Sequence, residues 1–181
     1  MIPSNKTVTS QAGMSLIEVL VAMVILSFGM ISFAGLQASS IKQGKMAQYR
    51  TVASQLATDF ADRMRANANE AVNNASYDYP QAYAPMGAAM AVPACAAVLC
   101  TEAEIAAIDL AQWRNLARVS LPGGSLFSIT DAAAPVLTAV DFWVLWQDPN
   151  QDDLNDVGMN CPPEIGNNAN GPRCMHFRFS L

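Results

Sequence analysis

An apolar run over residues 14–41 is the feature that most constrains this chain. The run contains no Lys, Arg, Asp, His or Pro, and Glu18 is its only ionisable side chain. A membrane-spanning helix needs roughly 20 apolar residues, so a run of this length can cross a bilayer. A charge inside such a helix costs about 2.5–3.5 kcal/mol and by default marks a function that needs a partner. The sequence therefore predicts a membrane helix in which Glu18 has a specific role.

Two simpler explanations of the run are a conventional signal peptide and a plain membrane anchor. The apolar core of a signal peptide is about 7–15 residues long, which is shorter than this run. An anchor accounts for the length, but it explains neither Glu18 nor the small pair Ala12-Gly13 that stands just before Met14. The junction between Gly13 and Met14 and the carboxylate of Glu18 therefore favour a segment that is neither a signal peptide nor a plain anchor.

Residues 13–22 resemble the leader junction of type IV prepilins and of type II secretion pseudopilins. The resemblance implies that prepilin peptidase cuts between Gly13 and Met14 and methylates the new amino group of Met14. Most pilins have Phe at this position, but Met14 is also bulky and apolar. In pilins the glutamate that matches Glu18 pairs with the amino-terminal charge of a neighbouring subunit. A buried carboxylate is tolerated mainly when it is paired, although an isolated Glu18 could instead bind a proton in the bilayer.

Three segments follow from this interpretation: a cleaved leader over residues 1–13, a transmembrane and assembly helix over residues 14–41, and a periplasmic head over residues 42–181. The distribution of basic residues conflicts with this orientation. Lys42, Lys45 and Arg50 follow the run, whereas Lys6 and the amino terminus precede it, and the positive-inside rule alone favours the opposite topology. The leader favours an external head. The four cysteines, which all follow the run, favour it as well.

The helical pattern continues beyond the run. Apolar side chains recur at helical spacing along one stripe, namely Met46, Tyr49, Ala53, Leu56, Phe60 and Met64. No proline occurs between Ser4 and Tyr79. The sequence therefore predicts one helix over about residues 15–65, apolar all round in its first half and amphipathic in its second.

The remaining segments predict an α+β, pilin-like head in which the long helix packs on an antiparallel sheet. We expect residues 67–100 to be irregular. Thr101 and Glu104 form a capping-box pattern that opens a helix to about Leu116. Four segments have strand character, and we expect strands at residues 117–121, 126–130, 139–146 and 175–181.

Four cysteines follow the membrane run, which fits disulfides in an oxidising compartment. Four cysteines allow three connectivities, of which we favour the nearest-neighbour one, Cys95–Cys100 and Cys161–Cys174. A zinc site is the rival interpretation. The chain has no Cys-x-x-Cys pair and its single histidine is His176, so the ligand spacing disfavours zinc.

Composition and motifs argue against an enzyme and against a nucleic-acid-binding protein. The net charge is −5 and no basic cluster occurs, which disfavours phosphate binding. Neither a Gly-x-Ser-x-Gly elbow nor a phosphate-binding loop is present. We interpret His176 as a surface residue of an alternating strand and predict no catalytic residues.

One acidic string near the C-terminus has the ligand types that calcium prefers. Oxygen-bearing side chains alternate at Asp148, Asn150 and Asp152, and Asp156 follows. The string lacks the mid-loop glycine and the distal glutamate of an EF-hand. A solvated acidic turn is the simpler interpretation, and calcium is the alternative; we expect no other cofactor.

Several downstream features resemble the PilV-like minor pilins of type IV pili. They are the string Asp62-Arg63-Met64-Arg65-Ala66-Asn67, the helix over residues 100–113, Leu121-Pro122-Gly123-Gly124 and a late Trp-rich strand. This resemblance implies a minor pilin that primes pilus assembly at or near the filament tip and supports twitching, adhesion or DNA uptake through the filament.

The same resemblance implies the partners and the location of the protein. The partners would be other minor pilins, the major pilin, prepilin peptidase, the inner-membrane assembly platform and, as a further candidate, a tip adhesin. The protein would be stored in the inner membrane with a single span and a periplasmic head, and would enter the pilus on assembly. The alternatives are a type II secretion pseudopilin and a membrane-anchored, calcium-dependent binding module.

Overall fold

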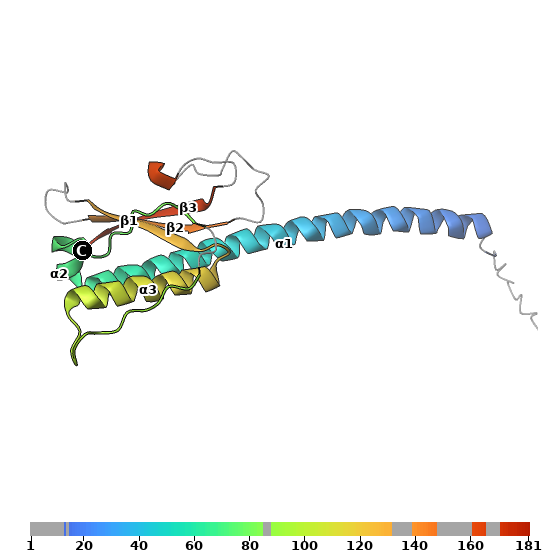
Figure 1. Cartoon of the computed structure of the whole chain (residues 1–181). Coiled ribbons are helices and arrows are strands. Elements are labelled where there is room, and N and C mark those ends of the chain that lie inside the picture. The colour runs from blue at the N-terminus through green and yellow to red at the C-terminus, as the bar shows by residue number, and fades with distance from the viewer. Residues whose placement is uncertain (1–12, 14, 85–87, 132–138, 148–160, 166–170) are drawn as a thin grey trace, which may run out of the picture. The chain divides into compact units, whose positions relative to one another are not determined.

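The computed structural model of the chain describes residues 13, 15–84, 88–131, 139–147, 161–165 and 171–181. The chain divides into two compact units, Met1–Ile41 and Lys42–Leu181. Its elements are an N-terminal helix, two further helices and a three-stranded antiparallel sheet (Figure 1). The predicted α+β class is therefore confirmed.

Helix α1 (Leu16–Ala66) runs without interruption from the first unit into the second. Its first turn closes where the backbone N–H groups of Glu18 and Val19 donate to the carbonyl oxygen of Ser15. The predicted long helix is confirmed, with ends that differ by one residue. Among the described residues, α1 is the one helix that is long and apolar enough to cross a membrane.

The second unit adds two helices, α2 (Ala68–Asn73) and α3 (Glu102–Ser120). The capping box predicted at the start of α3 is present, with Thr101 and Glu104 each bonded to the other's backbone N–H. Helix α2 was not expected, because residues 67–100 were predicted to be irregular throughout. Its buried Glu70 accepts hydrogen bonds from the side chains of Asn74 and Ser76. These bonds tie α2 to the residues that directly follow it.

The predicted strand at residues 117–121 is wrong, because α3 continues to Ser120. Ala117 is buried on the same face of the helix as Trp113, one turn earlier. The alternation of apolar and polar residues in this segment resembles a strand. Ala117 and Leu121, however, follow Trp113 at intervals of four residues and are buried, whereas Val119 is exposed, which is the pattern of a helix.

A tight turn ends α3 and starts the sheet. The backbone N–H of Leu121 donates to Ala117 O, and Gly123 has a positive φ of 60°. A Cβ atom on Gly124 would lie 2.0 Å from Ala117 O, so only glycine fits there. The Pro122 carbonyl accepts from Gln147 N at 2.7 Å, which fixes the turn to the end of strand β2.

The sheet is an antiparallel meander of β1 (Ser125–Asp131), β2 (Ala139–Trp146) and β3 (Arg173–Ser180), with β2 in the centre. The register pairs Phe127 with Trp143 and Trp143 with His176. A 3₁₀ turn, η1 (Pro163–Ile165), precedes β3. The three predicted strands at residues 126–130, 139–146 and 175–181 are thus present, each within two residues of the expected bounds.

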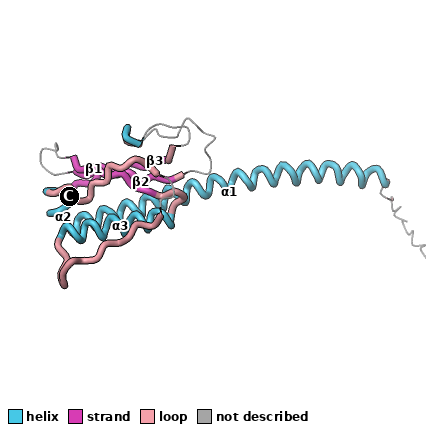
Figure 2. Tube along the Cα trace, in the orientation of Figure 1, coloured by secondary structure: helices cyan, strands magenta, loops and turns pink. Residues whose placement is uncertain are grey.

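One face of the sheet packs on the second half of α1 and on α3 (Figures 1 and 2). Four aromatic rings form the centre of this core. The Phe60 and Phe142 rings are stacked with centroids 4.6 Å apart, and Trp113 meets Phe142 edge-on at 5.4 Å. Tyr77 meets the edge of Phe60 at 5.9 Å. The amphipathic stripe predicted for α1 therefore packs against the sheet, as its spacing indicates.

The opposite face of the sheet carries a smaller apolar cluster. Phe127, Leu145 and Ile165 are buried there, and the ring of Trp143 packs edge-on against Phe127 at 5.6 Å. The sequence predicted one buried face only. The difference arises because Ile165 from η1 covers part of the second face.

Candidate assembly site

Glu18 lies in the first turn of α1 and is exposed within the single chain. The large apolar side chains around it are exposed as well, including Leu16 at 78% and Ile17 at 69%. All described residues from Leu16 to Ile41 are likewise exposed. This part of the helix therefore has no apolar partner within the chain, which is consistent with membrane anchoring and with packing in a filament.

The predicted processing site falls partly outside the described residues. Gly13 is described and exposed, whereas Met14 is outside them. Cleavage between these two residues and methylation of Met14 remain predictions, as does the pairing role of Glu18.

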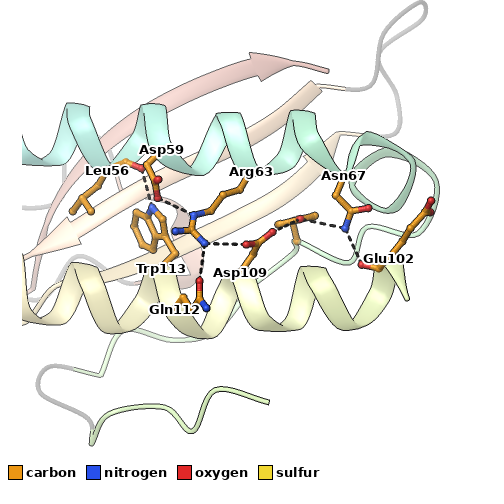
Figure 3. A network of polar contacts seen from close by, with 9 residues as sticks. Leu56, Asp59, Arg63, Asn67, Glu102, Asp109, Gln112 and Trp113 are labelled. Atoms are coloured by element: carbon orange, nitrogen blue, oxygen red, sulfur yellow. Dashed lines mark hydrogen bonds and ion pairs between the residues drawn. The ribbon is translucent and has the colours of Figure 1, made fainter. Parts of the chain in front are cut away.

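In the head, an ion-pair network joins α1 to α3 around Arg63 (Figure 3). The guanidinium donates from Nε to Asp59 Oδ2 at 2.9 Å and from Nη1 to Asp109 Oδ1 at 2.9 Å. Nη1 also lies 3.2 Å from Gln112 Oε1. Burial alone would lower the pKa of Arg63, but Asp59 and Asp109 outweigh it and hold that pKa above its ordinary value.

The network extends to the end of α1 through two further side chains. The Tyr77 hydroxyl donates to Asp109 Oδ2 at 2.8 Å, and burial raises the pKa of this hydroxyl above its ordinary value. Asn67 Nδ2 donates to the Tyr77 hydroxyl and, at 2.8 Å, to Glu102 O. These bonds fix where α1 ends relative to where α3 begins (Figure 3).

A buried hydrogen bond completes the contact between the two helices. The indole Nε1 of Trp113 donates to Leu56 O at 2.8 Å, and Trp113 is fully buried. Since Leu56 pairs with Trp113, Arg63 with Asp109 and Asn67 with Glu102, the helices run antiparallel. The string that includes Arg63 and Asn67 was noted from the sequence, but its partners on α3 were not found.

Both disulfides join nearest neighbours, as the sequence analysis favours. Cys95 pairs with Cys100 across a short loop, and Cys161 pairs with Cys174, with Cα atoms 5.0 and 5.1 Å apart respectively. Cys174 is on β3, so the second disulfide holds the segment that begins at Cys161 against the sheet. The first stands directly before α3.

His176 is an exposed residue of β3. Its ring stacks on Trp143 with centroids 4.5 Å apart, and its Nε2 lies 2.9 Å from Asp141 Oδ1. Arg178 donates to the other oxygen of Asp141 at 3.0 Å. These contacts assign His176 a cross-strand role on the surface of the sheet.

The predicted calcium ligands Asp148, Asn150, Asp152 and Asp156 lie outside the described residues, so calcium binding stays a prediction. Within the described ranges, His, Cys, Asp and Glu side chains form no group of three that could hold a metal ion.

Residues 9–34 match the family described as "Prokaryotic N-terminal methylation motif". This motif supports a type IV pilin or a pseudopilin, with processing by prepilin peptidase and other pilins as partners. It suggests a structural protein rather than an enzyme. No curated protein and no solved structure matches the chain significantly.

Proposed function

We propose that this protein is a minor pilin that takes part in initiating type IV pilus assembly, at or near the filament tip. The observation that carries the proposal is Glu18, the one ionisable side chain of an exposed apolar helix start inside the methylation motif. A carboxylate in an apolar helix bundle needs a positive partner. The methylated amino group of a neighbouring subunit supplies that charge at the same depth.

The head supports the proposal by its construction. Its core and the Arg63 network hold α3 against α1, and two disulfides brace the segments around the sheet and before α3. A braced head on a long apolar helix suits a subunit that is stored in a membrane and then packed among neighbours. PilV-like minor pilins are the branch whose features the head resembles.

Deletion of the gene tests the proposal, with piliation scored by electron microscopy and twitching motility measured beside it. The proposal predicts few or no pili, restored when the intact gene is returned. Normal piliation and motility in the deletion strain would contradict it.

A pseudopilin of a type II secretion system is the second candidate, because pseudopilins carry the same motif. The same deletion strain separates the two, since loss of exported enzymes from the medium with intact pili would favour the secretion system.

A further inference from the structure

Two basic side chains at the start of the head have no role in the topology that the leader implies. Lys42 and Lys45 stand just after the apolar run, and both are exposed. The positive-inside rule alone would place the segment that they begin in the cytoplasm. Both residues belong to the head, because the second compact unit begins at Lys42. Their position therefore indicates a function in the head itself.

The helices are basic at the end of the head that contains Lys42. Residues 42–58 of α1 and residues 110–130, from α3 to β1, contain no acidic side chain and five basic ones: Lys42, Lys45, Arg50, Arg114 and Arg118. The guanidinium carbon of Arg114 lies 4.3 Å from the centre of the Tyr79 ring. No carboxylate of the described residues pairs with Lys42, Lys45 or Arg118. The helical surface at this end is therefore positive, although the chain has a net charge of −5.

Lys45 lies on the side of α1 that faces α3. Lys45, Val52 and Asp59 follow one another at intervals of seven residues, so they share one face of the helix. Val52 and Asp59 line the groove between α1 and α3, and Leu116 lines it from α3. Leu116 is therefore level with Val52, about 15 Å along α1 from Lys42 at 1.5 Å per residue. The last turn of α3 and Lys45 thus lie on the same side of the head.

Apolar side chains are exposed in the last turns of α3. Val119 is 70% exposed, and Leu116, three residues earlier, is 42% exposed. Arg118 directly precedes Val119 and is exposed as well. Protein surfaces that lie in the interface of a bilayer combine basic and apolar side chains in this way. We name Lys42, Lys45, Leu116, Arg118 and Val119 the basal patch.

We propose that the basal patch docks the head on the anionic headgroups of the bilayer that α1 spans, before the chain enters a filament. Residues 16–41 of α1 are about 39 Å long at 1.5 Å per residue, whereas the hydrocarbon core of a bilayer is about 30 Å thick. A helix longer than the core is accommodated by tilting. A tilt toward α3 brings Lys45, Arg118 and Val119 to the headgroups together, and anionic lipid favours this direction because it attracts the two cations.

An acidic surface of another protein is the alternative occupant, since it would match the same charges. Continuity of the chain favours the lipid: the apolar run ends at Ile41 and Lys42 follows at once, so the bilayer is the surface that the patch meets first. The inference goes beyond the proposed function, because it requires that α1 spans a membrane but not that the chain acts in a pilus.

Val119 distinguishes a docked head from an upright one. In an upright helix, Val119 and Arg118 lie about 15 Å or more beyond Lys42, which exceeds the Debye length of about 8 Å at physiological ionic strength. Only Lys42 and Lys45 would then be attracted by the lipid. Contact between Val119 and the headgroups therefore requires the proposed tilt.

Fluorescence quenching in lipid nanodiscs tests the docking on the full chain. A nitrobenzoxadiazole label is placed on Val119→Cys with both native disulfides intact, and a fixed fraction of the lipid carries a spin label on its headgroup as the quencher. Discs of phosphatidylcholine are compared with discs of equal parts phosphatidylcholine and phosphatidylglycerol. EDTA in all samples prevents calcium from bridging the acidic string at residues 148–156 to the lipid.

We expect stronger quenching of the Val119 label in the anionic discs. The ratio of docked to undocked heads should rise at least about tenfold, since each basic residue near such a surface contributes about fivefold. Salt at about 1 M, where the Debye length is about 3 Å, should remove the difference. Equal quenching in the two kinds of disc, or a difference that salt does not reduce, would overturn the proposal.

The same label at a second position of α3 is the positional control. Ala107 is exposed and lies about 18 Å before Val119 along the helix at 1.5 Å per residue, away from the basal patch. A label on Ala107→Cys should be quenched equally in both kinds of disc. A rise in the anionic discs as large as that of the Val119 label would contradict docking through the patch.

Removal of two charges gives an independent measurement. The double variant Lys45→Gln, Arg118→Gln should lower the ratio of docked to undocked heads about twentyfold in the anionic discs. The control Arg65→Gln, Arg178→Gln changes the net charge equally and removes two half-exposed arginines outside the patch, so it should leave the ratio unchanged. Equal losses in the two double variants would show that net charge, and not the patch, determines the docking.

Photo-crosslinking in cells identifies the occupant of the patch. A photoreactive phenylalanine at Val119 should form an adduct with phospholipid, detected by mass spectrometry. An adduct with a protein in place of lipid, or no lipid adduct, would overturn the proposal. The discs contain no other pilus protein, so absence of docking there overturns this inference alone, whereas normal pili in a deletion strain overturn the proposed function alone.

Discussion

Arg63 on α1 and Asp109 on α3 are joined by a bond of 2.9 Å between Nη1 and Oδ1, in a site where both side chains are largely shielded from water. Asp109 also accepts from the buried Tyr77, so it links the helix pair to the loop that follows α2. This pair holds α3 against α1.

Replacement of Arg63 by Ala should lower the free energy of unfolding of the head by about 1–3 kcal/mol, because it leaves Asp109 partly buried without its cation. Urea unfolding of the full chain in detergent micelles, followed by tryptophan fluorescence, measures this change. Arg65→Ala is the matched control: Arg65 is 53% exposed and pairs only with Asp62 among the bonds described. We expect a loss below about 0.5 kcal/mol there, and similar losses in both variants would contradict the role of the network.

The carboxyl group of Asp78 should make the free energy of unfolding of the head decrease as the pH rises. Burial raises the pKa of this carboxyl, although hydrogen bonds from the backbone N–H and hydroxyl of Thr130 act against the increase. The folded chain therefore binds this proton more tightly than the unfolded chain, and its contribution to stability is lost as pH rises through the folded pKa.

Asp78→Asn removes this titration and retains an oxygen that can accept from Thr130. The stability of the variant relative to the unmodified protein should therefore increase between about pH 3 and pH 7. Urea unfolding at a series of pH values gives the difference curve. A flat curve, or one that falls with pH, would show that Asp78 is not penalised by burial.

The long helix and the central strand could be predicted because each has a clear period. The stripe that includes Leu56 and Phe60 repeats at helical spacing over many residues, and buried side chains alternate with partly buried ones from Val140 to Val144 in the middle of β2. The segment 117–121 is too short to distinguish the two periods, and its burial against Trp113 decides in favour of the helix. Local sequence carries no information on that contact.

The Arg63 network could not be predicted for a different reason. Its partner Asp109 is 46 residues away, and nothing in the sequence near either residue specifies the pairing. The disulfide pairing could be inferred because short loops make neighbouring cysteines the simplest partners.

The two disulfides should contribute unequally to stability. In the chain-entropy model, the Cys161–Cys174 loop is worth about 3 kcal/mol and the shorter Cys95–Cys100 loop about 2 kcal/mol. Paired Cys→Ser substitutions, compared by urea unfolding, measure each. Loss of the second disulfide should also release the cover that Ile165 gives to the outer face of the sheet, detectable as a change in Trp143 fluorescence. A larger effect of the first disulfide on unfolding would contradict this assignment.

Glu18→Ala should block incorporation into filaments while leaving the head folded. Breaking a buried ion pair typically costs about 3–5 kcal/mol, which corresponds to a loss of incorporation of about a hundredfold or more. Immunoblots of sheared filaments and of membranes measure incorporation and storage separately. Glu18→Asp keeps the charge and should recover part of the incorporation; wild-type incorporation of the alanine variant would contradict the pairing role.

Intact-mass and N-terminal peptide mass spectrometry of the native protein determine whether the chain is processed as a prepilin. We predict a mature chain that begins at Met14 and carries one methyl group on its α-amino nitrogen. A mature chain in which the bond between Gly13 and Met14 is intact would contradict it.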